Sequence, residues 1–284
     1  MAKIINIFPL DKTEGDFGVE IEVEGRGLAV IDNARWTTTD DGSLRGNYPD
    51  QRSEYVLKNP LPLKAAVAAV NELAGWHERS GSVHNFSFRT SCHVHVNVQE
   101  MEEEQVLNML YTYYIIEKVL IRFCGESRVG NRFCLRAYDA EEILAMLADV
   151  FRNGIVRTNE YGVDNIRYAA LNLAALRKYG SVEFRSMRGT MDTKVLTLWL
   201  TALASLREYG KKCASPADVY EDFAALGADG FLNKVLGITA NAFKYEGFIQ
   251  DINVGASLTI DLPFRYAARN AKLVEPEAID QLNF

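Results

Sequence analysis

The stretch SCHVHVNV, residues Ser91–Val98, alternates polar and apolar side chains and therefore predicts a β-strand with two different faces. Successive side chains of a strand point to opposite sides, so His93, His95 and Asn97 share one face. Cys92 and the three valines take the other face. This strand decides the fold, because its apolar face must be buried under other elements, such as helices, while its face of imidazoles and an amide needs polar surroundings.

Two further strands repeat the pattern. In FGVEIEV, Phe17–Val23, Glu20 and Glu22 point one way and the aliphatic residues the other. In the later stretch GSVEFRSM, Glu183 and Arg185 share a face. Each of the three strands thus has an apolar face and a face of ionisable groups at alternate positions. We interpret the second face as the floor of a polar cavity.

The remaining elements place these strands in a fold class. Strands are also predicted at Leu28–Ile31, Ser53–Leu57, Arg167–Leu173 and Gly180–Met187, with a turn at 178–180, and helices at Lys64–Glu78, Glu102–Cys124, Ala140–Arg152, Asp192–Cys213, Pro216–Ala225 and Phe231–Leu236. Strands and helices do not alternate as βαβ units, so we predict an α+β fold with an antiparallel or mixed sheet covered by helices. Without repeats or linkers, residues 1–284 are expected to form one domain, with the motifs in 17–192 and a helical part from 193 to 284.

The composition of the chain excludes several classes of protein. Hydrophobic residues make up 48% and charged residues 24%, as in ordinary globular proteins. The net charge of -7 argues against general nucleic-acid binding, which needs a basic surface. The most apolar stretch, Val195–Leu206, is too short to span a membrane and predicts a buried helix. Four scattered cysteines without metal-binding spacing, and no apolar leader, favour a cytoplasmic protein with reduced thiols.

The ionisable face points to metal chemistry. Two carboxylates two residues apart on a strand repel each other unless a cation compensates them, and Mg²⁺ or Mn²⁺ prefers carboxylate oxygens with an occasional imidazole. The residues that could supply such ligands are Glu20, Glu22, Glu54, His93 and Glu183. Arg185, and also Arg167, carry the planar guanidinium that matches a phosphate group.

Each motif alone is common, because an ExE strand is usually a solvated face, HxH is often structural and ExR is usually an ion pair. Their joint occurrence favours a functional site. No P-loop and no GxGxxG loop after a strand is found, so any ATP is held in another way. A zinc hydrolase is disfavoured because the neighbouring candidates are glutamates. The basic stretch Arg128–Arg132, followed by Arg136, is interpreted equally well as a solvated turn or as an anion contact.

The ordered set FGVEIE, SEYV, SCHVHVN, RYAALNL and VEFRSMRGT resembles the amidoligase family of the carboxylate-amine ligase superfamily, related to glutamine synthetase and the glutamate-cysteine ligases. The resemblance implies a curved antiparallel sheet forming a funnel, with helices outside and ATP and metals inside. By resemblance, Glu20, Glu22, Glu54, His93 and Glu183 are metal ligands. Arg185, Glu183 and Arg167 would act in catalysis, and His95, Asn97, Asn172 and Arg185 would contact the nucleotide.

The implied reaction is ATP- and Mg²⁺-dependent joining of a carboxylate to an amine through an acyl phosphate. Small-molecule substrates follow, namely an amino acid, a peptide or a modified nucleotide, with no membrane partner and a homo-oligomer left open. A guanidino-kinase-like phosphotransferase and a non-catalytic binding protein on the same sheet remain alternatives. Asn172 has the opposite parity from Arg167, so either the strand contains a bulge or one of the two points away from the cavity.

Overall fold

The computed structural model describes residues 2–160 and 167–274. Within these residues, seven strands pair antiparallel in one open sheet of order β2-β3-β1-β5-β7-β6, while β4 pairs with the far end of β1. The strands are β1 (Phe17–Arg26), β2 (Trp36–Thr39), β3 (Arg52–Leu57), β4 (Val83–Asn85), β5 (Ser91–Asn97), β6 (Leu171–Asn172) and β7 (Ser181–Arg188). The predicted α+β class with an antiparallel sheet is confirmed.

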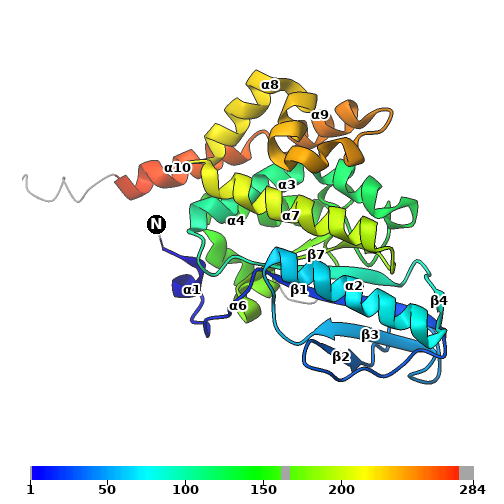
Figure 1. Ribbon diagram of the computed structural model, residues 1–284. Coiled ribbons are helices and arrows are strands. Elements are labelled where there is room, and N and C mark those ends of the chain that lie inside the picture. The colour runs from blue at the N-terminus through cyan, green and yellow to red at the C-terminus, as the bar shows by residue number, and fades with distance from the viewer. Residues whose placement is uncertain (1, 161–166, 275–284) are drawn as a thin grey trace, which may run out of the picture.

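Helices provide most of the remaining structure, and the long ones gather on one side of the sheet, while the short α1 and α6 lie beside its end (Figure 1). They are α1 (Ile4–Ile7), α2 (Leu63–Ser80), α3 (Glu103–Cys124), α4 (Glu141–Asn153), α6 (Ala175–Tyr179), α7 (Thr193–Lys212), α8 (Pro216–Leu236), α9 (Phe248–Leu258) and α10 (Leu262–Val274). Short 3-10 segments lie at Glu126–Arg128, Ala137–Asp139, Ile155–Asn159 and Gly237–Phe243. Among the described helices, none has the length and apolar character that crossing a bilayer requires.

The apolar faces of the strands form the core, as their alternation predicts. Val19, Ile21 and Val23 of β1 are buried, and so are Val94 and Val96 of β5. Against them pack α2 along β1, α7 along β5 and α3 along β7. Burial of these side chains contributes about 1.5 to 3 kcal/mol each, so the helices hold the sheet from this side and leave its ionisable face uncovered by core helices.

The four long predicted helices between residues 64 and 213 are confirmed, and their ends follow local chemistry. Asp192 caps α7 because its carboxylate accepts the backbone N–H groups of Lys194 and Val195. The two helices predicted at Pro216–Ala225 and Phe231–Leu236 are joined as α8, which is interrupted by non-helical backbone at Gly227 (φ 64°, ψ 176°). The sequence break between them therefore marks a kink.

One strand prediction is wrong and another is confirmed only in part. Leu28–Ile31 is not a strand, because its backbone groups bind scattered partners instead of one neighbouring strand. Leu28 N–H donates to Asp50 O, Ala29 O accepts the Tyr55 hydroxyl, and Ile31 N–H donates to Thr38 Oγ1. The strand at this place in the chain is β2, which the sequence did not predict. Of Arg167–Leu173 only β6 is a strand. Before it, Tyr168 O and Ala170 N–H exchange backbone hydrogen bonds with Leu135, which forms an isolated β-bridge outside the sheet order.

Two glycines lie where an added side chain would collide with another segment of the chain. The predicted turn at 178–180 is the end of α6, where Gly180 adopts φ 64° and an added Cβ would lie 2.3 Å from Gln99 Cγ. Gly255 of α9 lets that helix approach α3, since a Cβ there would lie 2.3 Å from Ile115 O.

The cysteines form no disulfide among the described residues: Cys92, Cys124, Cys134 and Cys213 are all free.

Candidate active site

The register of the sheet brings the predicted site residues together on its ionisable face. Glu20 of β1 lies opposite His93 of β5, and Glu22 lies opposite Glu54 of β3. On the other side of β5, His95 lies opposite Glu183 of β7. Residues separated by up to 163 positions in the chain thus become neighbours, and five of them come from the three alternating strands.

His93 lies at the centre of this group. Its Nδ1 is 3.3 Å from Glu20 Oε2 and 3.7 Å from Glu183 Oε1, and its Nε2 is 3.9 Å from Glu22 Oε1. Ser91 Oγ lies 2.7 Å from the same Nε2. Because three carboxylates surround one imidazole that is only 4% exposed, His93 is held in one orientation and in a strongly negative environment.

A second group lies toward the beginning of β1. Glu20, His95 and Glu183 each offer one atom, and these atoms all lie within 4.8 Å of one another. Ser181 Oγ is 3.0 Å from His95 Nδ1, which leaves Nε2 facing Glu20 at 3.6 Å. Asn172 Nδ2 donates to Glu183 Oε2 at 2.6 Å. Partners of this kind fix the orientation of ligand side chains in metal sites.

A third group, toward the end of β1, contains a residue that the sequence analysis did not assign. Ligand atoms of Glu22, Asp41 and Glu54 lie within 4.8 Å of one another, and Glu20, Glu54 and His93 form a further such set. Asp41 comes from the loop between β2 and β3, where no periodicity marks it. Glu22 also accepts the backbone N–H of Ser91, at 2.8 Å.

The pKa values of the glutamates divide the site into two ends. Burial raises the pKa of Glu20, but hydrogen bonds from His93 and His95 outweigh it and hold that pKa well below its usual range. Burial likewise raises the pKa of Glu183, and the neighbouring Arg185 outweighs it, so the net shift is downward. At the other end burial raises the pKa of Glu22, and burial together with the charge of Glu20 raises the pKa of Glu54 to about 7. His93 lowers both pKa values in part, but the net shift is upward, and a metal ion would relieve the remaining negative charge.

Arg185 reaches the same face through an irregularity of the sheet. The register of β5 against β7 shifts between Cys92 and Val94, so that an extra residue of β7 faces His93. The Arg185 guanidinium donates to Glu183 Oε1 through Nη1, while its Nε is buried and has no hydrogen-bond partner. A buried unpartnered donor beside a group of carboxylates fits an oxyanion that metal ions bring to this place.

The residues predicted to contact the nucleotide lie in different surroundings. His95 and Asn97 line a cavity of about 360 Å³ together with Gly18, Tyr179 and the segment 56–60. Asn97 uses its amide N–H groups on Thr13 O and Gly15 O, at 3.0 and 2.8 Å, and so anchors the segment before β1.

Asn172 and Arg167 lie in different places, as their opposite parity along the chain indicates. Asn172 lies on the ionisable face beside Glu183. Arg167 is exposed in the turn before β6, where its guanidinium lies 4.7 Å from the centre of the Tyr168 ring and donates to the Tyr168 hydroxyl.

Ser91, Ser181 and Asp41 are the neighbours that the sequence analysis missed. The two serines could have been found, because each shares the polar parity of its strand with a histidine or glutamate. For Asp41 no sequence signal existed.

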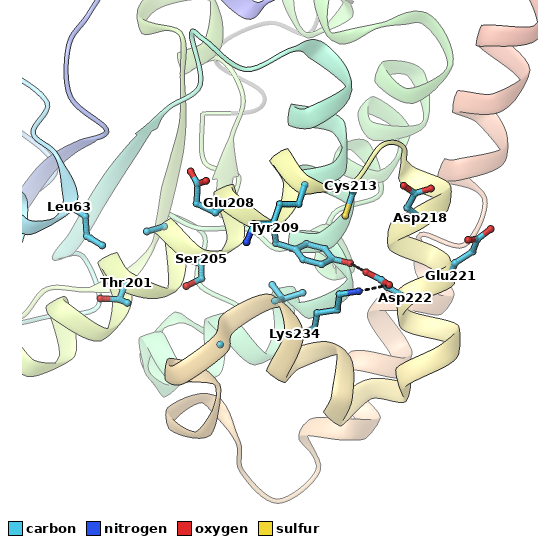
Figure 2. Close-up of a pocket in the computed structure, with 14 residues that line it drawn as sticks. Leu63, Thr201, Ser205, Glu208, Tyr209, Cys213, Asp218, Glu221, Asp222 and Lys234 are labelled. Carbon is cyan, nitrogen blue, oxygen red and sulfur yellow. Dashed lines mark hydrogen bonds and ion pairs between the residues drawn. The ribbon is translucent and has the colours of Figure 1, made fainter.

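A cavity of about 740 Å³ lies in the helical layer between α7, α8 and the start of α2 (Figure 2). There Asp222 accepts the Tyr209 hydroxyl at 2.7 Å and pairs with Lys234 at 2.6 Å. These central charges neutralise one another, and the lining has no histidine. The ionisable face of the sheet is therefore the stronger candidate for catalysis.

The middle of the chain matches a known protein family. A family model described as "Putative amidoligase enzyme" matches residues 56–206, which include β5, β7, His93, Glu183 and Arg185. No curated protein matches the chain. The matched region lacks β1, so the family match and the carboxylates of Glu20 and Glu22 are independent observations.

Proposed function

Because the chain belongs to the amidoligase family, whose model covers more than half of its 284 residues, we propose that it is an ATP- and Mg²⁺-dependent ligase joining a carboxylate to an amine. The family indicates a ligase-like enzyme, and nucleotide, metal and acyl phosphate are our finer proposal. One observation carries it: three sets of carboxylate and imidazole atoms, each within 4.8 Å, overlap along a single sheet face.

The donor set fits hard divalent cations. Glu20, Glu183 and a histidine would hold one ion near β7, and Glu22, Glu54 and Asp41 would hold another near β3. Mg²⁺ or Mn²⁺ bound there supplies positive charge that shields the oxygens of a phosphate chain. The raised pKa values of Glu22 and Glu54 describe carboxylates that a second ion would keep ionised.

The cavity beside His95 is our proposed position for the nucleotide base. Its volume of about 360 Å³ falls in the range of small-ligand pockets, and it opens next to Glu20, the residue shared by two metal-ligating sets. Asn97 would act there by holding the Thr13–Gly15 backbone as a wall, since both of its donors are engaged. Asn172 would orient Glu183 in the same way.

Arg185 is our candidate for stabilising the transferred phosphoryl group. A substrate carboxylate oxygen attacks the γ-phosphorus, ADP leaves, and the acyl phosphate forms. The amine nitrogen then attacks the acyl carbon, phosphate leaves, and the amine loses a proton. A guanidinium with a free buried N–H can follow the phosphoryl oxygens through the first step. Arg167, exposed in its turn, would act only at the rim.

Hydroxylamine capture tests the proposal. The full chain is incubated with ATP, Mg²⁺ and pooled amino acids, peptides and nucleosides carrying carboxylates, and hydroxylamine replaces the amine. We expect a hydroxamate, with ADP and phosphate released in equal amounts and no product without metal. Glu24→Gln serves as a matched control, because Glu24 shares the face of β1 but belongs to none of the metal-ligating sets found among the described residues.

A stable phosphorylated product that hydroxylamine does not intercept would instead establish a phosphotransferase. Saturable nucleotide binding without ADP from any pool would establish a binding protein. We also propose that the enzyme acts in the cytoplasm, where thiols such as those of its four free cysteines stay reduced.

A further inference from the structure

Three arginines surround two phenylalanine rings beside the Glu22 end of the site. The guanidinium of Arg45 lies 5.3 Å from the centre of the Phe88 ring, and that of Arg132 lies 4.9 Å from the centre of the Phe133 ring. Arg89 lies 5.6 and 5.7 Å from the two ring centres. The rings themselves are stacked with centroids 6.4 Å apart. We call these five residues the arginine-phenylalanine cluster.

The charges of this cluster are uncompensated within the part of the chain that the structure describes. None of its three guanidiniums has a described carboxylate partner within ion-pair distance, and Arg89 Nε is buried without a hydrogen-bond partner. The two other arginines of the basic stretch differ. Arg128 is buried and donates to the carbonyls of Ser186 and Arg185, and Arg136 pairs with Asp139. Their role is structural, whereas the cluster holds three positive charges on a chain of net charge -7.

The loop between β2 and β3 joins the cluster to the metal-ligating residues. Asp41 belongs to the set with Glu22 and Glu54, and two residues later Ser43 O accepts a hydrogen bond from Arg89 Nη1 at 2.8 Å. Arg45, two residues further, donates its backbone N–H to Glu24, the next carboxylate along β1. The cluster therefore borders the end of the carboxylate row opposite the cavity beside His95.

From these observations we infer that the arginine-phenylalanine cluster binds an oxyanion group of the substrate, a carboxylate or a phosphate, away from the reacting carboxyl group. The inference rests on the proposed function for its setting and names its substrate class: an anionic molecule with at least two negatively charged groups. Guanidiniums stacked on rings keep their N–H edges free, and these edges match the paired oxygens of both groups.

The geometry also explains why the anion would come from the substrate rather than from ATP. The proposed base cavity lies at the beginning of β1, beside Gly18, and the cluster lies beyond Glu22, near the strand's end. A nucleotide in that cavity presents its phosphates to the metal-ligating residues between them. The anionic end of the second reactant is left to face the cluster.

Calorimetric binding of two probes, glutarate and phenyl phosphate, tests the site on the full chain at constant Mg²⁺ without ATP. We expect saturable binding of at least one probe to the wild type and an increase in Kd of at least tenfold in Arg45→Ala/Arg132→Ala. Both arginines are exposed, so the double variant should fold, and Arg132→Ala alone should give an intermediate loss. Arg79→Ala, an exposed arginine on α2, is the matched control and should bind like the wild type.

The probe that binds identifies the source of the anion, a carboxylate for glutarate and a phosphate ester for phenyl phosphate. Equal binding to wild type and double variant would assign the anion to the metal and overturn the inference, as would no binding of either probe. The binding test contains no ATP, so its result does not depend on whether the protein has ligase activity. In the active enzyme the double variant should raise KM for the substrate at least tenfold and leave KM for ATP unchanged.

Discussion

Replacing Glu22 with glutamine should have opposite effects on stability without and with metal. Glu22 is 4% exposed and its Oε2 accepts both the backbone N–H and the hydroxyl of Ser91, at 2.8 and 2.5 Å. A glutamine keeps an oxygen for these bonds and has nearly the same volume. The change therefore removes a charge and a metal ligand and preserves the packing of β1.

The expected gain without metal follows from Coulomb's law. Ligand atoms of Glu54 and Asp41 lie within 4.8 Å of one from Glu22, so each ionised pair costs about 3 kcal/mol at an effective dielectric constant near 20. Attraction to a protonated His93, at 3.9 Å, offsets about 4 kcal/mol of this. Solvent screening at the partly exposed Asp41 leaves a net gain of about 1 to 2 kcal/mol for the variant.

The sign of the pH dependence can also be stated. The folded-state pKa of Glu22 is raised, mainly by burial, so the folded protein keeps this proton to higher pH than the unfolded chain. The wild type consequently loses stability as pH rises through the folded pKa. The advantage of Glu22→Gln should be small near pH 4 and should grow toward pH 8.

Metal reverses the order. Mg²⁺ together with a non-hydrolysable ATP analogue should raise the free energy of unfolding of the wild type by about 2.7 kcal/mol at a hundredfold excess over Kd. The same ligands should stabilise Glu22→Gln far less, and urea unfolding measures both values. Glu24→Gln, which is equally buried and should retain the hydrogen bond from Arg45 N–H, should follow the wild type. The reasoning fails if Glu22→Gln unfolds without metal, which would make Glu22 part of a structural network, or if it keeps the full stabilisation by metal and nucleotide.

Three further outcomes can be measured. Arg185→Lys should lower kcat about a hundredfold in a steady-state ADP assay, because an ammonium cannot present the planar donors that a phosphoryl group needs, and an unchanged kcat would remove Arg185 from catalysis. His77 is buried against Tyr55 and His84, and burial lowers its pKa to about 4. The unfolded chain therefore takes up this proton first as pH falls, and the wild type should lose about 2 kcal/mol of unfolding free energy between about pH 6.5 and pH 5. Urea unfolding of His77→Phe should show most of that loss removed. Asn97→Ala breaks the two bonds to the Thr13 and Gly15 carbonyls and should cost about 2 to 3 kcal/mol by thermal unfolding, whereas a change below about 0.5 kcal/mol would show that this segment is held otherwise.

The alternation of three strands was sufficient to predict the ionisable face. Glu20, His93 and Glu183 could be assigned to one side of a sheet because the period of a strand is two, and a strand with an apolar face has one register that buries it. The same logic predicted the helices that cover the other side. It could not predict which strands are neighbours, because Glu22 meets Glu54 only through pairing of β1 with β3.

Residues in loops escaped prediction for a different reason. Asp41 and Arg45 lie in a connection without periodicity, and they reach the site only because the loop folds back on Glu24 and Arg89. The helix α9 lies within the predicted helical part from 193 to 284, but its bounds were not predicted, because Gly255 lowers its helix propensity although that glycine is needed where α9 approaches α3. In both places contacts between distant segments decided the structure, and these are not written in local sequence.

The central claim is that phosphate is transferred to a carboxylate, and isotope transfer measures this directly. The carboxylate substrate identified by hydroxylamine capture is prepared with ¹⁸O in both carboxyl oxygens and turned over with ATP, Mg²⁺ and the amine. If an acyl phosphate forms, one labelled oxygen leaves with phosphorus, and ³¹P NMR should show one ¹⁸O atom in each inorganic phosphate released. Unlabelled phosphate accompanying amide formation would contradict the account.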